Sequence, residues 1–250
     1  MSNNATVRQC KKIRDRIYDR EQFAESIFRR EVLMLVSPES TLVDVGCGRK
    51  AKFLRSLSSH VKKAYGIDLE ISETVVEGKV QIMYGDAEAL PLPNRSTDLI
   101  TMYDVVEHFR DPKRVFLECK RILKPGGALV LVTTCKFYPP ILLGRALPHC
   151  IRRWANPIIS GTKKEDTFPA YYKANSARAL RRLSTSVGLN VVSIKHLTYH
   201  PEYYMFSTLF YRCAVAVERF VLQREIFTHL RHHILCQLRR PVEMQYDSCA

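Results

Sequence analysis

Short apolar runs alternate with longer mixed segments along the first 135 residues. The runs have the length of strands and end at charged residues or glycine, while several segments between them repeat apolar positions every three to four residues. We predict strands at 41–46, 63–68, 80–84, 98–102 and 128–134, and helices at 12–36, about 50–60, from about 72, and at 112–123. Strands and helices that alternate in this order favour an α/β fold with a parallel sheet.

The pattern changes after the fifth strand. Residues 137–175 combine prolines and cations with apolar groups, which predicts a substrate-side insertion that forms a lid or a lipid-facing patch. Ser176 is a suitable N-cap for a helix at 177–187, and Gly188 is a suitable end for that helix. The segment 190–197 has the composition of a sixth strand.

The rest of the chain allows two interpretations. Residues 203–240 have the composition of two basic amphipathic helices that lie on a membrane surface. Residues 233–238 are also short, apolar and soon followed by Pro241, as a reversed seventh strand would be. We favour the second interpretation, which makes 201–228 an apolar helical insertion. The predicted fold is a doubly wound, Rossmann-like, seven-stranded and mostly parallel sheet with a reversed last strand and helical insertions in the C-terminal half.

The chain divides on this basis into five parts. They are an N-terminal helical cap at 1–40, a cofactor-binding half of the domain at 41–136, a substrate-side insertion or lid at 137–175, the C-terminal half of the sheet with its apolar insertion at 176–241, and a tail at 242–250. The length of 250 residues and the hydrophobic content of 46% suit one α/β domain with such additions.

Positive charge is concentrated in the C-terminal part of the chain. The formal net charge is +14, and residues 141–240 hold 16 Lys or Arg against 5 Asp or Glu, whereas residues 1–140 hold 23 against 18. An excess of this size favours an anionic partner, either a phospholipid surface or a nucleic acid, over a basic face with no partner.

Neither a signal peptide nor a membrane-spanning segment is predicted. No run of 18 apolar residues occurs, and the charged first 30 residues lack an apolar signal core. The eight cysteines are scattered without a C-x-x-C pair, which favours reduced thiols over disulfides or a metal site. We therefore predict a cytoplasmic protein with no metal, either soluble or peripheral on the inner face of a membrane.

The motif with the most chemical information follows the first predicted strand. Gly46 and Gly48 form a turn after an apolar run, and Asp68 ends the next strand twenty residues later. Glycines at a strand-to-helix turn let the backbone approach a ligand, and an acidic residue at that distance is placed to accept hydrogen bonds from ribose hydroxyls. This spacing predicts a βαβ unit that binds a nucleoside.

Two nucleoside cofactors fit that unit. The pattern Gly46-x-Gly48-x-x-Ala51 matches the dinucleotide fingerprint of NAD-binding proteins. However, Asp44 at the strand tip would repel an anionic pyrophosphate about 4 Å away by roughly 4 kcal/mol at an effective dielectric constant near 20. The same carboxylate would attract the ammonium and sulfonium groups of S-adenosylmethionine, so the sequence favours that cofactor.

This region resembles the class I S-adenosylmethionine-dependent methyltransferases, in particular the small-molecule or lipid methyltransferases of the UbiE/UbiG type. The resemblance covers residues 42–134. Further segments that resemble family motifs are 85–93 on the adenine side, 97–109 at the methyl-transfer loop and 124–127 before the fifth strand. In the family, the aspartate of the adenine-side segment reaches the adenine amino group, and the resemblance gives that role to Asp86.

The resemblance also implies a set of cofactor-binding residues. They are Asp44, Gly46, Cys47, Gly48, Asp68, Leu69, Asp86, Ala87, Tyr103 and Asp104. One departure from the family pattern is Lys50, which stands where many relatives have a third glycine. We interpret Lys50 as a helix-opening residue whose side chain points away from the cofactor.

Glu107 and His108 are the catalytic candidates, because they lie in the predicted methyl-transfer loop. Methyl transfer from a sulfonium is an in-line displacement whose rate comes mostly from positioning, and a hydroxyl acceptor would benefit from a general base. His108 is a suitable base, and Glu107 could orient its imidazole or bind a divalent cation. The alternative is that Glu107 and His108 cap the next helix and pack against the sheet.

The sequence favours a lipid-like acceptor over a nucleic acid. The segment 104–107 lacks the Pro-Pro-aromatic pattern of enzymes that methylate nucleic-acid amino groups, and Cys135 lacks the partner Pro-Cys of RNA cytosine methyltransferases. Aromatic residues cluster with aliphatic ones at 203–211, which suits an acyl or prenyl chain at an anionic bilayer better than stacked bases.

We therefore predict a methyltransferase that acts on an oxygen or carbon of a lipid-like, quinone-like or lipid-linked small acceptor at an anionic membrane surface. An RNA or nucleic-acid methyltransferase is the first alternative. An NAD(P)-binding oxidoreductase or a non-catalytic cofactor-binding scaffold is the second.

Overall fold

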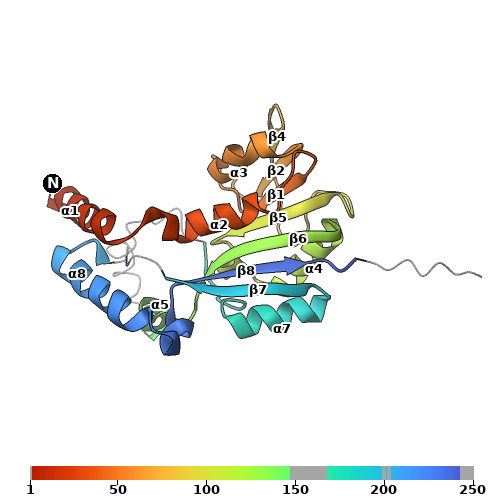
Figure 1. Cartoon of the computed structure of the whole chain (residues 1–250). Helices are drawn as coiled ribbons and strands as arrows, with labels where there is room; N and C mark the ends of the chain where they lie inside the picture. Colours follow the sequence, from red (N-terminus) through yellow and green to blue (C-terminus); the bar gives the residue numbers. More distant parts are fainter. Residues whose placement is uncertain (1, 147–167, 199–200, 202–203, 243–250) are drawn as a thin grey trace, which may run out of the picture.

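The chain folds around one mixed β-sheet with helices on both faces (Figure 1). The computed structural model describes residues 2–146, 168–198, 201 and 204–242. Within these residues, eight strands pair in the order β3-β4-β2-β1-β5-β6-β8-β7. The strands are β1 (Thr41–Val45), β2 (Lys63–Asp68), β3 (Val75–Glu77), β4 (Val80–Tyr84), β5 (Thr97–Tyr103), β6 (Leu123–Thr134), β7 (Asn190–Leu197) and β8 (His233–Arg239).

Helices connect or flank these strands. The described α-helices are α1 (Ser2–Ile17), α2 (Ala24–Leu33), α3 (Lys52–Leu57), α4 (Pro112–Ile122), α5 (Pro139–Ala146), α7 (Ala177–Val187) and α8 (Thr208–Val217). Shorter elements are the 3₁₀-helices η1 (Arg20–Gln22), η2 (Ser58–His60), η3 (Val106–His108) and η7 (Glu225–Leu230), and the π-helix η6 (Glu218–Leu222).

The order and direction of the strands confirm the predicted doubly wound sheet. β1 pairs in parallel with β2 and β5, β2 pairs in parallel with β4, and β5 pairs in parallel with β6. β8 runs antiparallel between β6 and β7, with His233 opposite Thr134. β8 is therefore the reversed last strand that the sequence predicted.

The sheet has one strand more than the seven predicted. β3 pairs antiparallel with β4, where the sequence predicted a short helix from about residue 72. Val75 and Val76 are β-branched and fit a strand, and Gly78, with a φ of +57°, turns the chain back into β4. These local preferences produce a hairpin at this edge, so the predicted helix is wrong.

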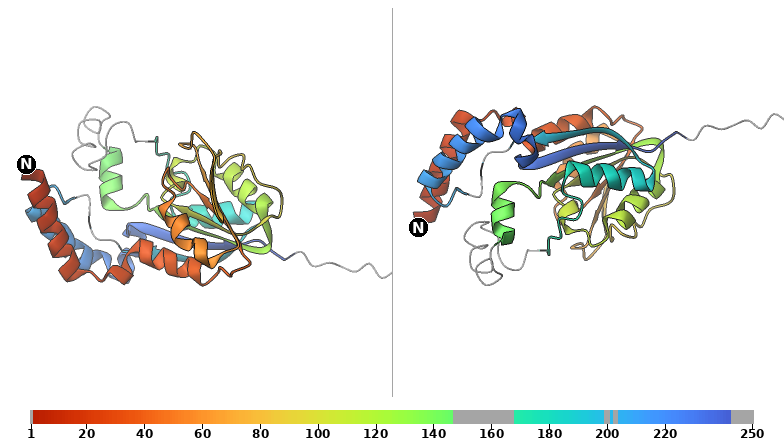
Figure 2. Two further views of the ribbon diagram at one scale, coloured as in Figure 1. Left: turned by 90° about the horizontal axis from the view of Figure 1, so that it is seen from above. Right: turned by 90° about the horizontal axis from the view of Figure 1, so that it is seen from below.

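The single helix predicted at 12–36 is also wrong, because the segment contains a break. α1 ends at Ile17 and α2 begins at Ala24, with η1 between them. Asp19 caps η1 by accepting a hydrogen bond from the Glu21 N–H at 3.0 Å. The break lets α1 leave the sheet and lie beside α8, while α2 packs on the sheet (Figures 1 and 2).

Two hydrophobic clusters fill the two faces of the sheet. α2 and α3 cover one face, where Phe28 and Leu54 join strand residues such as Leu42 in the core. α4 and α7 cover the other face, where Phe116 and Leu180 join the core. A third cluster, away from the sheet, joins α1 to α8 and consists of Cys10, Met205, Tyr211 and Val215 with partly buried neighbours. The α1–α8 pair is therefore a packed unit at one end of the molecule.

The division of the chain into a cap, two halves of a domain, a lid and a tail stays a prediction. Residues 147–167 of the predicted lid and 243–250 of the predicted tail lie outside the described residues. In the part of the chain that the structure describes, no helix combines the length and the apolar character needed to cross a membrane.

Candidate active site

A cavity of about 480 Å³ opens at the carboxyl ends of β1, β2, β4 and β5. Ligands bind at this edge of open α/β sheets. The residues that line the cavity include seven that the sequence predicted for the site, namely Gly46, Asp68, Leu69, Asp86, Ala87, Asp104 and His108. These residues follow four different strands, so the fold brings separate motifs to one place.

The turn after β1 requires glycine at position 46. Gly46 has a φ of +76°, and a Cβ at this position would lie 2.7 Å from Cγ2 of Val105. Gly48 also has a positive φ, +66°, but a Cβ there would meet no atom within 4 Å. Gly46 is therefore constrained by conformation and by space, and Gly48 by conformation alone.

Asp68 is held in place by the glycine turn. Its Oδ2 accepts a hydrogen bond from the Gly48 N–H at 2.8 Å, and its Oδ1 accepts one from the Glu70 N–H at 2.9 Å. Carboxylate oxygens have further lone pairs, so Asp68 can still accept hydrogen bonds from a ribose diol. The two backbone contacts fix the carboxylate at the end of β2, on the wall of the cavity.

Asp86 occupies the corresponding position after β4. Its Oδ1 accepts a hydrogen bond from the Glu88 N–H at 2.9 Å, which orients the carboxylate. The preceding residue, Gly85, allows a close approach of the chain, because a Cβ there would lie 2.7 Å from Cγ2 of Ile67. Asp86 can therefore accept a hydrogen bond from an amino group at this end of the cavity.

Acids outnumber cations around the cavity. Its described lining holds four acids, Asp68, Asp86, Glu88 and Asp104, and one cation, Arg110. Such a lining attracts a cation and repels a pyrophosphate. The residues present therefore fit S-adenosylmethionine as a cationic ligand, and the roles of Asp68 at the ribose and of Asp86 at the adenine amino group stay predictions.

Asp44 lies beneath the turn and does not line the cavity. Its side chain is almost fully buried, at 4% exposure, and its Oδ1 accepts a hydrogen bond from the Thr101 hydroxyl at 2.8 Å. Burial, helped by the nearby charge of Asp68, raises the pKa of Asp44 to about 7. Asp44 therefore does not touch the space where the cofactor is expected, and its predicted contact with the cofactor stays a prediction.

Cys47, Gly48 and Tyr103 also lie outside this cavity. Cys47 and Gly48 line a second cavity of about 490 Å³ beside the turn, together with Lys50. Burial raises the pKa of the Cys47 thiol to about 12, which keeps it protonated. The ring of Tyr103 packs against Phe28, with 5.3 Å between the ring centroids. Whether these residues contact the cofactor stays a prediction.

His108 lines the cavity with a defined tautomer. Its Nδ1 lies 3.1 Å from the Pro169 carbonyl oxygen, and a carbonyl only accepts hydrogen bonds, so Nδ1 carries the proton. The neutral ring then keeps a lone pair on Nε2. The ring also meets Phe168 edge-on, with 6.1 Å between the centroids. His108 thus has the chemistry of a general base.

Glu107, the residue before this base, is held against β6 by hydrogen bonds. It is buried, and its carboxylate accepts hydrogen bonds from the hydroxyls of Thr133 at 2.9 Å and Thr134 at 3.3 Å. Burial, and then the charge of Asp104, raise the pKa of Glu107. The Pro169 carbonyl, and not Glu107, is the group that contacts the His108 ring nitrogen.

The alternative role of Glu107 and His108 is wrong for the helix cap, although Glu107 does pack against the sheet through Thr133 and Thr134. Asp111 caps α4, because its Oδ1 accepts hydrogen bonds from the N–H groups of Lys113 at 3.0 Å and Arg114 at 3.2 Å. The described residues also contain no group of three or more His, Cys, Asp or Glu side chains placed to hold a metal ion.

The sequence reasoning missed part of the cavity wall, formed by Phe168, Pro169 and Tyr171. This segment is tied down by the Glu107 carbonyl, which accepts hydrogen bonds from the N–H groups of Tyr171 at 2.7 Å and Tyr172 at 3.2 Å. The aromatic run at 168–172 was the available signal, because exposed aromatic residues in a connecting segment often line a ligand site.

His233 is a second residue that the sequence reasoning missed. It begins β8 and is buried, and its Nε2 lies 3.4 Å from Oδ1 of Asp104. Asp104 has a φ of +50°, in the left-handed region that residues other than glycine adopt rarely. Asp104 thus joins the end of β5 to the start of β8 at the wall of the cavity.

Comparison with known proteins identifies the same region. A family model described as a methyltransferase domain matches residues 43–131. A demethylmenaquinone methyltransferase from Thermotoga maritima is 32% identical over 163 residues, which cover 63% of this chain and 66% of that protein. A ubiquinone biosynthesis O-methyltransferase from Burkholderia thailandensis is 27% identical over 173 residues, which cover 66% of this chain and 70% of that protein.

The fold has solved counterparts as well. A geranyl diphosphate C-methyltransferase from Streptomyces coelicolor aligns with a TM-score of 0.58 at 19% identity, covering 87% of this chain and 77% of that one, and at this identity the likeness concerns the fold alone. Across four of the curated relatives, the matched part spans 21% to 66% of the relative's own length. The matched domain and its relatives therefore identify residues 43–131 as an S-adenosylmethionine-dependent methyltransferase domain.

Proposed function

We propose that this chain transfers the methyl group of S-adenosylmethionine to an oxygen or carbon atom of a quinone-like, lipid-like or lipid-linked small acceptor at a membrane surface. The observation that carries the proposal is the lining of the 480 Å³ cavity, where acids suited to a cationic cofactor meet an aromatic wall. Phe109, Phe168 and Tyr171 form that wall, and His108 lies beside it. Flat apolar side chains of this kind suit an aromatic or isoprenoid acceptor.

The chain's own contribution is positioning and deprotonation. Bound S-adenosylmethionine would supply an electrophilic methyl group. Asp68 and Asp86 hold the nucleoside at one end of the cavity, which aligns donor and acceptor and accounts for most of the rate. His108 presents Nε2 to the acceptor, because Nδ1 carries the ring proton and donates a hydrogen bond to the Pro169 carbonyl. Nε2 is therefore the atom that removes a proton from an acceptor hydroxyl.

The relatives support this class of acceptor. The names of the two similar curated proteins refer to demethylmenaquinone and ubiquinone, and the name of the structural relative refers to geranyl diphosphate. All three compounds carry an isoprenoid chain, which partitions into apolar surroundings. A location in the cytoplasm, peripheral on the inner face of a membrane, is part of the proposal.

The alternatives have less support from the site. The net charge of +14 would favour binding of RNA by an RNA methyltransferase. However, most charged residues that line the cavity are acids, which repel a phosphate backbone. An NAD(P)-dependent oxidoreductase would have to place a pyrophosphate beside Asp68 and Asp104. A scaffold that only binds the cofactor would have no use for the tautomer of His108.

The experiment that tests the proposal has two stages. Calorimetric titration of the full chain with S-adenosylmethionine and with NAD should give heat only with S-adenosylmethionine. Radioactive methyl transfer should then label a soluble catechol or quinol that carries a short isoprenoid chain, and it should leave transfer RNA unlabelled.

Each stage has a result that contradicts a different part of the proposal. Heat from NAD alone would overturn the cofactor assignment. Heat from neither compound would favour a scaffold. Binding of S-adenosylmethionine with label only in RNA would leave the methyl donor in place and overturn the acceptor class.

A further inference from the structure

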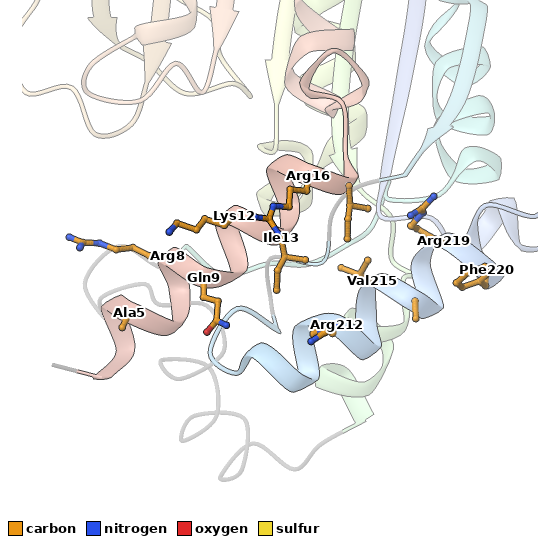
Figure 3. Close-up of a pocket in the computed structure, with 12 residues that line it drawn as sticks. Ala5, Arg8, Gln9, Lys12, Ile13, Arg16, Arg212, Val215, Arg219 and Phe220 are labelled. Atoms are coloured by element: carbon orange, nitrogen blue, oxygen red, sulfur yellow. The ribbon is translucent and has the colours of Figure 1, made fainter.

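A second large cavity, of about 1080 Å³, lies between α1 and the α8–η6 segment (Figure 3). We call it the basic groove. Five cations line it, namely Arg8, Lys12 and Arg16 from α1, Arg212 from α8 and Arg219 from η6. Its described lining contains no acid. The site described above does not use this groove.

The floor of the basic groove is apolar. Ile13 and Ile17 of α1 and Val215 of α8 line the groove. Figure 3 shows Ile13 and Val215 in the space between the two helices. The groove therefore combines cations with hydrocarbon surface, which suits a ligand that has an anionic head and an apolar chain.

The two walls of the basic groove are locked together. The Tyr18 hydroxyl donates a hydrogen bond to Oε2 of Glu218 at 2.9 Å, and the Cys10 thiol reaches the Met205 carbonyl at 3.8 Å. Glu218 is buried behind the groove wall, and among the groove cations it interacts with Arg219. The spacing of the two helices is thus set by internal contacts and does not need a ligand.

Most cations of the basic groove have no acid partner of their own. In the described ranges, none of the five forms an ion pair or a hydrogen bond from its side chain, and only Arg219 has an acid nearby, Glu218. The nearby acid Asp15 is occupied, because it pairs with Arg14 at 2.9 Å and with Arg20 at 3.3 Å. Four unneutralised cations in one groove attract anions strongly and repel one another, so an anionic partner stabilises them.

Large apolar side chains are exposed on α8, η6 and η7, the segment that forms one wall of the basic groove and continues beyond it. Leu209 is 70% exposed, Phe220, which lines the groove, is 72% exposed, and Ile226 is 73% exposed. We call these three residues the apolar rim. Aliphatic side chains such as Leu209 and Ile226 do not stack on nucleic-acid bases, and together with Phe220 they suit the acyl boundary of a bilayer.

The basic groove and the active site lie toward the same end of the sheet, where the parallel strands have their carboxyl ends. β8 begins at His233, three residues after η7 ends, and His233 pairs with Thr134 at the carboxyl end of β6. The carboxyl ends of the parallel strands also carry the 480 Å³ cavity. An external surface that binds the basic groove would therefore lie near the opening of the 480 Å³ cavity, through which an acceptor must enter.

We propose that the basic groove and the apolar rim dock on the surface of an anionic phospholipid bilayer. The cations take lipid headgroup phosphates, and the rim side chains enter the boundary between headgroups and acyl chains. The purpose of this docking, access to a membrane-held acceptor, rests on the proposed function, whereas the docking itself can be measured without methyl transfer.

The test is sedimentation with large vesicles of phosphatidylcholine alone or mixed with phosphatidylglycerol. The full chain should bind the mixed vesicles and leave the neutral ones. The triple variant Arg8→Gln, Lys12→Gln and Arg212→Gln should bind the mixed vesicles on the order of 100-fold more weakly, since each cation near such a surface contributes roughly 5-fold.

A matched control removes three exposed cations from α7. The changes are Arg178→Gln, Arg181→Gln and Arg182→Gln, and they lower the net charge by the same amount at a different helix (Figure 1). This control should keep most of the vesicle binding. Phe220→Ser with Ile226→Ser should weaken binding about 10-fold with little change in its salt dependence, because apolar contact is not screened by salt.

Three outcomes would overturn the docking proposal. They are equal binding by the groove variant and the α7 control, equal binding to neutral and anionic vesicles, and binding of RNA in the absence of vesicle binding. Calorimetry with S-adenosylmethionine checks that each variant keeps a folded cofactor site. A chain that binds anionic vesicles but transfers no methyl group would keep the docking proposal and overturn the proposed function.

Discussion

The cofactor cavity and the basic groove carry opposite charges in one chain. The cavity has four acids and one cation in its described lining, and the groove has five cations and no acid. The net charge of +14 has the sign of the groove and conceals the acidic site. The comparison teaches that local charge, and not the charge of the whole chain, decides which ligand each region takes.

The two regions also differ in how their charged groups are held. Asp68 and Asp86 accept hydrogen bonds from backbone N–H groups just after strand ends. Arg8 and Arg212 are exposed side chains on helices. A fixed carboxylate suits one small ligand in one orientation, whereas long cationic side chains suit a surface with many phosphates.

The substitution Gly46→Ala should have the largest effect, because it disturbs the fixed frame of the cavity. The new Cβ would lie 2.7 Å from Cγ2 of Val105 at a φ of +76°. The turn must then shift, and we expect the affinity for S-adenosylmethionine to fall at least about 100-fold in calorimetry. Vesicle binding through the basic groove should not change.

Gly48→Ala is the matched control for this prediction. It introduces the same side chain at a similar φ, +66°, but the Cβ meets no atom within 4 Å. We expect a loss of about 10-fold, from conformation alone. Equal losses at positions 46 and 48 would contradict the steric account of the turn.

The substitution His108→Gln should have the next largest effect. The side chain of glutamine keeps polarity near the Pro169 carbonyl but has no basic nitrogen. We expect kcat to fall about 100-fold for a hydroxyl acceptor, with the Kd of S-adenosylmethionine unchanged. A loss below about 3-fold would remove the role of a general base.

The substitution Asp86→Ala should have a smaller effect, on the cofactor alone. Loss of a hydrogen bond to a charged acceptor costs about 1.5–3 kcal/mol, so we expect binding about 10-fold or more weaker. The control ligand is an S-adenosylmethionine analogue in which oxygen replaces the adenine amino group. If Asp86 accepts from that amino group, the variant and the unaltered chain should differ little for the analogue.

The substitution Asp44→Asn should change the pH dependence of stability. The folded-state pKa of Asp44, about 7, lies above the unfolded value of 3.8, because burial penalises the charged form. This group therefore stabilises the fold below pH 4, and its contribution is lost as pH rises through 7, by about 1.4 kcal/mol per unit at most.

Denaturant unfolding at pH 5 and pH 8 measures this change. The side-chain carbonyl of the introduced asparagine can still accept the hydrogen bond that the Thr101 hydroxyl donates to Asp44 at 2.8 Å. The variant should therefore gain more stability relative to the unaltered chain at pH 8 than at pH 5. Its affinity for S-adenosylmethionine should fall several-fold because a negative charge near the turn is lost. An unchanged difference between the two pH values would contradict the burial account.

Elements with their own start and stop residues could be predicted from the sequence. The helix at 177–187 and the strand at 190–197 are confirmed with the predicted bounds. The Ser176 hydroxyl accepts a hydrogen bond from the Ala179 N–H, and Gly188, with a φ of +74°, ends the helix. These signals act within a few residues, so they can be read without the fold.

Contacts between distant segments could not be predicted in the same way. Phe168 reaches the cavity because the N–H groups of residues 171 and 172 bond to the Glu107 carbonyl, and no local pattern encodes that contact. The same holds for His233 beside Asp104 and for Tyr18 beside Glu218, 200 residues away. Asp44 belongs to a motif that the sequence analysis recognised, but its burial depends on packing between distant segments, which the motif does not predict.

The most direct test of the account is methyl transfer to an acceptor that is held in a membrane. A long-chain prenylated quinol in vesicles is supplied with radioactive S-adenosylmethionine, and the label in the organic phase is measured with and without phosphatidylglycerol. The account predicts transfer about 10-fold faster on anionic vesicles. The Arg8, Lys12 and Arg212 variant should lose this advantage and still label a soluble short-chain quinol. Equal rates on both kinds of vesicle, or no label in the organic phase, would contradict the account.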